Sequence, residues 1–219
     1  MSSPNEDVPL VPSHYNALAV IPHTPTSPTE RRPFICEIVR VGSSRYFDIE
    51  LLVKDFSDRN FKVGFVFPID EETNSTLHKY LKRGCTILIL AVERWEMPDG
   101  GDGTIVGNPR QIKVLPFRLS YVKNFEYRIR LFTSVVRGKR LCYGCGDRKF
   151  AIHRCIRCKM FYFCYKQCQA YGDEQGNHLI ECRILRDRDM AAIFRGQWNE
   201  LEEFSSLSLR PQVSLFPGY

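Results

Sequence analysis

Apolar and polar residues alternate with a period of two along two early stretches of the chain, which follow a short β-rich run over Phe34–Val41. Between Tyr46 and Lys54, the apolar side chains fall on every second position, which is typical of a strand with one buried face. The same alternation returns a few residues later, beginning at Phe61. The pattern therefore predicts three strands, over Phe34–Val41, Tyr46–Lys54 and Phe61–Phe67.

The pattern changes to helical spacing after the third strand. Leu77, Tyr80 and Leu81 recur at intervals of three and four residues, which predicts a helix over Asp70–Arg83 that ends at Gly84. Two further strands are predicted, over Cys85–Trp95 and 111–115, with a turn between them at Pro98–Gly103. Residues 117–136 are predicted to pack back on these strands, either as a helix or as a strand.

Three strands, one helix and two more strands match the element order of an OB-like barrel. We therefore expect a protein of the α+β class with a small β-barrel-like domain over 34–136. Residues 1–33 contain seven of the thirteen prolines and cannot bury enough apolar surface to offset the entropy of ordering. They are predicted to form a disordered arm rich in Pro, Ser and Thr, and residues 196–219 a C-terminal tail.

The composition indicates a globular protein, with 43% hydrophobic and 26% charged residues among 219. The longest fully apolar run, Ile87–Val92, is far shorter than the roughly 18 residues that a membrane span needs. The first seven residues contain no apolar core, so we expect no secretory signal and an intracellular protein, in the nucleus or the cytoplasm. Thiols stay reduced there, and nine cysteines then indicate metal binding.

The positive charge of the chain is concentrated in one region. The formal net charge is +6, and residues 137–195 alone contain thirteen Lys and Arg against six acidic residues. If seven thiolates and one histidine of this region bind two zinc ions, its net charge falls from +7 to about +4. A basic surface therefore remains after the metals are counted, and it could contact phosphate.

Eight residues of metal-ligand type occur within the forty-one positions from 142 to 182. Pairs separated by two residues suit a tight turn around one ion, and pairs four residues apart lie on one helix face. Thiolate and imidazole donors favour zinc, and eight of them complete two tetrahedral shells. The predicted ligands are Cys142, Cys145, Cys155, Cys158, Cys164, Cys168, His178 and Cys182.

This spacing resembles that of MYND-type zinc fingers, and Phe163 before the fifth ligand and Gln169 after the sixth also match that family. The resemblance covers about a fifth of the chain and implies a small zinc-stabilised helical finger, which we place with its following helix at 137–195. It also implies interleaved ligands. One zinc would bind Cys142, Cys145, Cys164 and Cys168, and the other Cys155, Cys158, His178 and Cys182.

Members of the family that bind proline-rich peptides use a tryptophan and a neighbouring glutamine. Here Tyr171 is the only aromatic residue between the sixth ligand and the histidine, and it is the candidate replacement. We therefore expect partner-binding residues at Tyr165, Gln169 and Tyr171. The apolar helix after the finger, over 179–194, is predicted to seal the second zinc site, with a partner groove as the alternative.

We expect the protein to be an adaptor in which the finger recruits another protein. Four protein ligands leave no open position on a zinc ion, and the cofactor signature of the methyltransferase domain found in some MYND proteins is missing, so we expect no enzyme. The alternative is a nucleic-acid-binding protein that uses the basic finger and the OB-like barrel. We expect nucleic acid to be an unlikely partner because carboxylates occupy the expected binding surface: Asp48, Glu50, Asp99 and Asp102.

Overall fold

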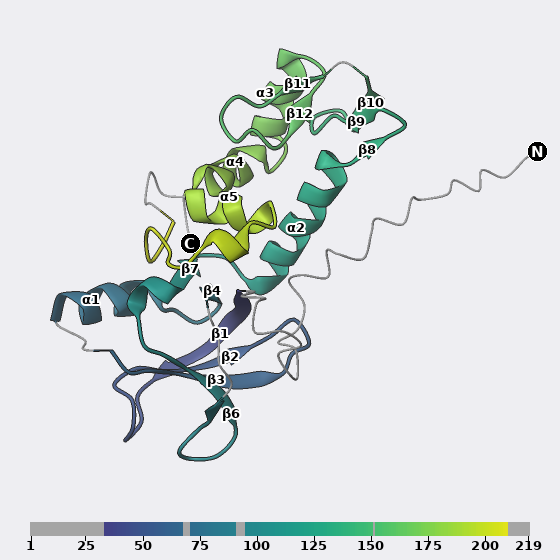
Figure 1. The fold of residues 1–219 in the computed structure, drawn as a ribbon. Helices are drawn as coiled ribbons and strands as arrows, with labels where there is room; N and C mark the ends of the chain where they lie inside the picture. The colour runs from purple at the N-terminus through teal and green to yellow at the C-terminus, as the bar shows by residue number, and fades with distance from the viewer. Residues whose placement is uncertain (1–32, 68–70, 91–94, 151, 210–219) are drawn as a thin grey trace, which may run out of the picture.

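The computed structural model describes residues 33–67, 71–90, 95–150 and 152–209. The predicted arm, apart from Pro33, and the last ten residues of the predicted tail lie outside this description. The described part combines a curled sheet with helices, as expected for the α+β class. Figure 1 shows the sheet at one end of the molecule and a small finger at the other, connected by the long helix α2.

The larger sheet has seven strands in the order β5-β6-β3-β2-β1-β4-β7. Neighbouring strands are antiparallel except for β3 and β6, which are parallel. A helix, α1, connects β3 to β4. The elements of this part are β1 (Phe34–Gly42), β2 (Glu50–Lys54), β3 (Asn60–Phe65), α1 (Glu71–Tyr80), β4 (Thr86–Ile89), β5 (Trp95–Glu96), β6 (Asp102–Val106), the 3₁₀ turn η2 (Pro109–Gln111) and β7 (Ile112–Leu115).

Strands near opposite ends of this sheet come from one stretch of chain. Strand β6 pairs with β3, whereas β7 pairs with β4, and only residues 107–111 separate β6 from β7. The sheet must therefore curl until its two ends approach each other, which gives it the shape of a half-barrel. We call residues 33–115 the barrel.

Both faces of the sheet are buried where β1, β4 and β7 lie side by side. Ile87 and Val114 belong to an apolar cluster inside the barrel, whereas Leu88 and Leu115 belong to a second cluster on its outer face. Because successive residues of a strand point to opposite faces, each of these strands contributes to two cores. Burial on both sides explains why β4 is apolar without alternation from Ile87 to Ile89.

The outer face of these strands is covered by α2 (Leu119–Thr133), so the open choice over 117–136 is settled as a helix. Its buried residues, Leu119, Val122, Phe125 and Ile129, recur at intervals of three and four and form one stripe. Glu37 of β1 accepts a hydrogen bond from the backbone N–H of Leu119 at 3.0 Å. This places a carboxylate at the positive end of the helix, where it is favourable.

The predicted strand over 46–54 begins later than expected, at Glu50. The chain turns first, with the backbone N–H of Ser44 donating to the carbonyl of Phe47 at 2.9 Å. The ring of Phe47 then covers Gly64, and a Cβ at position 64 would lie 2.6 Å from it. Phe47 is thus buried by a turn, which produces the same apolar spacing as a strand.

The other predicted elements of the barrel are close to those observed. Helix α1 lies within the predicted helix, and Gly84 after it has a φ of 84°. The predicted strand over 85–95 is shorter in the structure, where β4 covers Thr86–Ile89, and residues 91–94 lie outside the described part. The predicted turn at 98–103 is present between β5 and β6.

The finger contains two small sheets and three helices. Strands β8, β9 and β10 form one antiparallel sheet in the order β10-β9-β8, and β11 pairs with β12 in the other. Helix α3 follows β12, and α4 and α5 lead back towards the barrel (Figure 1). The elements are β8 (Val135–Val136), β9 (Lys139–Leu141), β10 (Arg148–Lys149), β11 (His153–Arg154), β12 (Tyr162–Phe163), α3 (Lys166–Glu174), α4 (His178–Arg186), α5 (Arg188–Phe194) and η3 (Trp198–Glu200).

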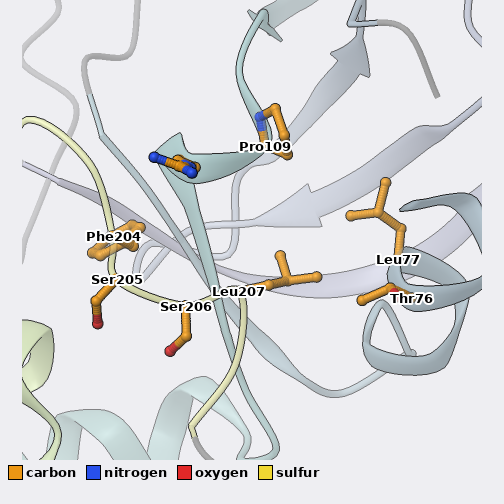
Figure 2. A pocket seen from close by; sticks show the side chains of 8 residues that line it. Thr76, Leu77, Pro109, Phe204, Ser205, Ser206 and Leu207 are labelled. Carbon is orange, nitrogen blue, oxygen red and sulfur yellow. The ribbon is translucent and has the colours of Figure 1, made fainter. Parts of the chain in front are cut away.

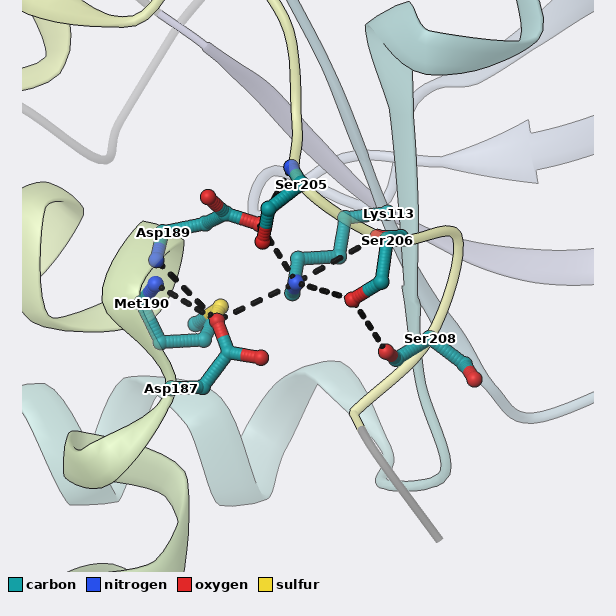
Figure 3. A network of polar contacts seen from close by, with 7 residues as sticks. All are labelled: Lys113, Asp187, Asp189, Met190, Ser205, Ser206 and Ser208. Atoms are coloured by element: carbon teal, nitrogen blue, oxygen red, sulfur yellow. Dashed lines mark hydrogen bonds and ion pairs between the residues drawn. The ribbon is translucent and has the colours of Figure 1, made fainter.

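A buried lysine connects the barrel to α5 and to the chain after it (Figure 3). Lys113 lies on the outer face of β7 with 0% of its side chain exposed, and its Nζ is 2.7 Å from Asp189 and 3.1 Å from Asp187. Asp187 also accepts hydrogen bonds from the backbone N–H groups of Asp189 and Met190 at the start of α5. The ammonium group additionally donates to the carbonyl and hydroxyl oxygens of Ser206. Barrel, α5 and the chain after it are therefore held by one buried network.

The predicted C-terminal tail is described as far as residue 209, and this part lies on the barrel. The backbone N–H of Val114 donates to the carbonyl of Leu207 at 2.7 Å, and Phe204 is buried. Between this segment, α1 and η2 lies a small pocket (Figure 2). Its lining combines polar and apolar residues, and the hydroxyls of Ser205 and Ser206 also take part in the network around Lys113.

Candidate metal centres and the surrounding surface

The structure brings the eight predicted ligands together as two groups of four. In the first group, Cys142 and Cys145 lie between β9 and β10, Cys164 follows β12, and Cys168 lies in α3. The ligand atoms all lie within 4.8 Å of one another, and the sulfurs of Cys145 and Cys164 are 3.8 Å apart. Gly144 is required here, since a Cβ at this position would lie 2.2 Å from the carbonyl oxygen of Cys168.

The second group is almost completely buried. Cys155 and Cys158 lie in the turn between β11 and β12, and His178 and Cys182 lie one turn apart on α4. The sulfurs of Cys155 and Cys182 are 4.0 Å apart, and the Nε2 atom of His178 is 3.8 Å from the sulfur of Cys158. The two groups interleave along the chain, as the family resemblance implies.

Either group could hold a metal ion. Four thiolates bound tetrahedrally to zinc at about 2.3 Å would have their sulfurs about 3.8 Å apart, close to the observed separations. A disulfide would instead hold two sulfurs at about 2.05 Å, and all nine cysteines are free thiols. The donor sets, four thiols in one group and three thiols with an imidazole in the other, fit a structural metal shell.

The orientation of His178 suits metal binding through Nε2. Its Nδ1 atom lies 2.5 Å from a carboxylate oxygen of Asp173, and Asp173 is also paired with Arg157 at 2.6 Å. A carboxylate at Nδ1 keeps the proton on that nitrogen, so Nε2 offers its lone pair to the group of cysteines. Asp173 therefore positions a ligand, although the sequence analysis did not single it out.

The thiols of each group influence one another's ionisation. A hydrogen bond from Cys182 lowers the pKa of Cys158 to about 3, and the same contact raises the pKa of Cys182. In the first group, burial raises the pKa of Cys164 to about 12, with a further contribution from the thiols of Cys142 and Cys145. One thiolate thus opposes the ionisation of the next, and a bound dication would stabilise all of them.

A buried carboxylate connects the second group to α2. Glu181, next to Cys182, is paired with Arg128 of α2 at 2.5 Å and accepts a hydrogen bond from the hydroxyl of Tyr143 at 2.7 Å. Burial raises the pKa of Glu181. The ring of Tyr143 also lies 5.5 Å from that of His178, so this network fixes α4 against the helix that leads back to the barrel. In the sequence, the only sign of a role for Glu181 is its position next to the predicted ligand Cys182.

The three predicted partner-binding residues lie on α3 or directly before it: Tyr165 precedes the helix, and Gln169 and Tyr171 belong to it. Tyr165 and Tyr171 are exposed, with exposed fractions of 69% and 58%, whereas Gln169 is half-buried. Gln169 and Tyr171 are two residues apart on α3 and therefore point to different sides of the helix. None of the three lines the pocket of Figure 2.

A basic surface lies beside the first group, on the sheet β8-β9-β10. From Arg137 to Phe150 the chain has five Lys and Arg, and the one acidic residue, Asp147, lies 3.4 Å from Lys149. Two of the cations lie against aromatic rings. Lys139 is 4.9 Å from the ring of Phe150, and Arg140 is 4.4 Å from that of Tyr162.

On the barrel, one of the carboxylates that we expected to repel phosphate, Asp99, is paired with a cation. Lys62 lies 2.5 Å from Asp99, and its hydrogen bond, together with the charge of Arg45, lowers the pKa of Asp99. Arg59 pairs with Asp55 at 2.7 Å in the same way. Of the other acids that we expected to repel phosphate, Asp48 is exposed and Glu50 is half-buried.

No family model matches the chain, and no curated relative was found. Solved structures resemble parts of it, among them two proteins that bind single-stranded DNA. Pot1pC of Schizosaccharomyces pombe bound to single-stranded DNA shares 15% identity, with 48% of this chain and 92% of that chain covered and a TM-score of 0.32. The mitochondrial single-stranded DNA binding protein Rim1 of S. cerevisiae shares 12% identity, with 39% and 91% covered and a TM-score of 0.25.

These comparisons correct two expectations of the sequence analysis. Both proteins bind single-stranded DNA, which contradicts the prediction of a protein-recruiting adaptor and the prediction that nucleic acid is an unlikely partner. The physical error was to treat carboxylates such as Asp99 as unpaired. At these identities and TM-scores the likeness locates no binding site, so the chain's own residues must do so. No helix among the described residues is long and apolar enough to cross a membrane.

Proposed function

We propose that this protein binds nucleic acid through the barrel and the basic finger, with the metal groups as structural supports. The observation that carries the proposal is the basic surface on β8-β9-β10, where five Lys and Arg meet a single acidic residue. Such a surface attracts phosphates and releases their counterions. Aromatic rings lie beside Lys139 and Arg140. Ion pairing with phosphate does not need such rings, whereas contact with the flat faces of bases does.

The barrel supplies a second surface in this proposal. Its order of strands and helix, β1-β2-β3-α1-β4 followed by β6 and β7, corresponds to an OB-like barrel, which binds nucleic acid on its second and third strands. Across the outer face, Arg40 lies opposite Leu52, and Leu52 lies opposite Lys62. At the rim, the guanidinium of Arg45 lies 4.5 Å from the exposed ring of Tyr46. Cations and an aromatic ring therefore line one side of the sheet.

We further propose that the two groups of four hold zinc and that the finger is of the MYND type. The support is the donor set, the spacing of the ligand atoms and the carboxylate behind His178. Four protein ligands fill each tetrahedral shell, so the ions would hold the finger in shape and activate no substrate. Together, Cys142 and Cys145 would fix the turn that presents the basic surface.

Salt-dependent binding of an oligonucleotide tests this function. The full chain is titrated against labelled oligo(dT) and oligo(U) by fluorescence anisotropy at several salt concentrations. We expect dissociation constants of roughly 1–100 µM near physiological salt, and a logarithm of affinity that falls linearly with the logarithm of salt concentration. An absence of binding, or binding that salt leaves unchanged, would overturn the proposal.

A variant with fewer charges provides the internal comparison. Replacing Arg137, Lys139 and Lys149 by glutamine removes three cations from the basic surface without touching a predicted metal ligand. Each lost phosphate contact should reduce the salt slope by about 0.7 for a single strand. A matched control replaces Lys79 and Lys82, which are exposed beside α1, and should leave the slope unchanged.

A further inference from the structure

Among the aromatic rings of the finger, the ring of Phe150 is the most exposed to solvent. Phe150, directly after β10, is 73% exposed and is the most exposed aromatic side chain in the described part of the chain. The neighbouring phenylalanines of the finger, Phe161 and Phe163, are at most 1% exposed. An apolar ring in water forgoes the free energy of burial, so its position needs an explanation other than the core.

The ring of Phe150 has a defined place. Lys149 lies opposite Arg140 in the β9–β10 pair, which puts Phe150 opposite Lys139, whose Nζ is 4.9 Å from the ring centre. The turn between β8 and β9 lies against the same ring. A Cβ on Gly138, which has a φ of 76°, would be 3.5 Å from it. The ring is thus supported on the side of the turn while most of its surface stays exposed.

The surroundings of the ring are positively charged. Arg137 is exposed in the same turn, and neither it nor Lys139 has a carboxylate partner among the described residues. Lys149 alone shares its charge, with Asp147. An exposed ring with one cation against it and another in the adjoining turn can receive a flat group that carries negative charge next to it.

We propose that Phe150 is a base-stacking platform for single-stranded nucleic acid, with Lys139 and Arg137 contacting the phosphates on either side of the stacked base. This inference rests on the proposed function and adds the preference for single strands. Every base has a π face, so stacking on an aromatic ring tolerates sequence but requires a base that is not already stacked in a duplex. The charge of the surface alone would bind duplex and single strand without that distinction.

The test compares Phe150→Ala with the wild type on labelled oligo(dT), oligo(U) and a duplex of the same length. Loss of one stacked base should weaken binding of the two single strands about 5- to 150-fold. Binding of the duplex should change less than about twofold, and the salt slope should stay the same because no phosphate contact is lost. The two single strands separate DNA from RNA as the preferred ligand.

Two further variants keep the test decisive. Phe150→Trp retains a flat ring and should bind oligo(dT) at least as tightly as the wild type, with indole fluorescence that the bound strand quenches. Tyr127→Ala removes a ring that is 65% exposed on α2, away from the basic surface, and should bind as the wild type does. A measured metal content equal to that of the wild type confirms that Phe150→Ala is folded.

The possible results distinguish a failure of base stacking on Phe150 from a failure of nucleic-acid binding as a whole. If the wild type binds none of the probes, the proposed function fails and the inference with it. If the wild type binds but Phe150→Ala loses affinity equally for single strand and duplex, or loses none, the proposed function stands and the stacking platform is refuted. A selective loss for single strands, restored by Phe150→Trp, supports both.

Discussion

The barrel and the finger are stabilised by different forces. Inside the barrel, closely packed apolar side chains such as Ile38, Leu51 and Val63 are fully buried and need no other support. The centre of the finger instead contains the eight ligand residues, with aromatic rings around His178; the ring of Phe163 lies 4.8 Å from it. The buried apolar side chains of the finger are part of the cluster that continues over α2 and the outer face of the barrel, so we expect the two metal groups to supply the stability that is the finger's own.

Removal of metal should produce the largest effect. A structural zinc site contributes on the order of 10 kcal/mol to folding, so a strong chelator should unfold residues 142–182 and leave most of the barrel intact. Native mass spectrometry should find two metal ions per chain before treatment. After chelation, limited proteolysis should show cleavage in the finger. Circular dichroism should show that the strand signal of the barrel is retained.

A cysteine pair provides the control for this experiment. Cys145→Ser should lower the metal content, whereas Cys85→Ser, in the barrel and outside both groups, should leave two ions bound. A native mass without metal, or a finger that resists protease after chelation, would contradict the comparison between the two regions.

The network around Lys113 makes the two regions dependent on each other. Lys113→Met keeps most of the side-chain volume but leaves Asp187 and Asp189 buried without their cation. Breaking a buried pair by removing one partner costs about 3–5 kcal/mol. We expect a fall of that size in the free energy of unfolding, measured by urea denaturation.

The surface pair of Lys62 and Asp99 is the matched control for Lys113. Lys62→Met should cost less than about 1 kcal/mol, because partly exposed ion pairs contribute little. If both variants lose the same stability, barrel and α5 are not joined by the buried network.

The sequence was most informative where chemistry dictates spacing. The eight ligand-type residues were identified from their spacing, and the structure brings them together in two groups, because a tetrahedral shell tolerates few arrangements of turns and helices. Strands β2 and β3 and helix α1 were found for a similar reason, since one buried face imposes a period on the chain, whereas β6 was not predicted. Phe47 shows the limit. Its spacing is that of a strand residue, but a turn over Gly64 buries it.

Pairing between distant residues could not be predicted. Lys113 is buried by Asp187 and Asp189, more than 70 positions away, and nothing in the local pattern of β7 marks it. Asp99 was counted as a free charge because its partner, Lys62, lies on another strand. The function was misjudged for this reason, since the sign of a surface depends on which charges are paired.

Substitution of Gly144 tests how tightly the backbone around the first metal group is packed. A methyl group at this position would lie 2.2 Å from the backbone oxygen of Cys168, so Gly144→Ala should displace α3 and its ligand. Overpacking of this kind costs about 1–3 kcal/mol. Metal content and melting temperature should both fall.

Gly107→Ala is the control, because no atom lies within 4 Å of the added Cβ and the residue is on the barrel. We expect it to change neither the metal content nor the stability by more than about 0.5 kcal/mol. Equal losses in the two glycine variants would mean that the finger is no more sensitive than the barrel.

The smallest expected effect concerns the charge of the barrel surface. The hydrogen bond from Lys62, and the charge of Arg45, lower the pKa of Asp99, so the pair is present above the ordinary pKa of Asp and is lost as the pH falls through the lowered value. Lys62→Gln should therefore raise the pKa of Asp99 towards its ordinary value of about 3.9, as followed by carboxyl NMR. In the opposite variant, Asp99→Asn, Lys62 is free to bind phosphate, and affinity for oligo(dT) should rise a few-fold with a steeper salt slope. An unchanged affinity would assign nucleic-acid binding to the finger alone and leave the barrel as its support.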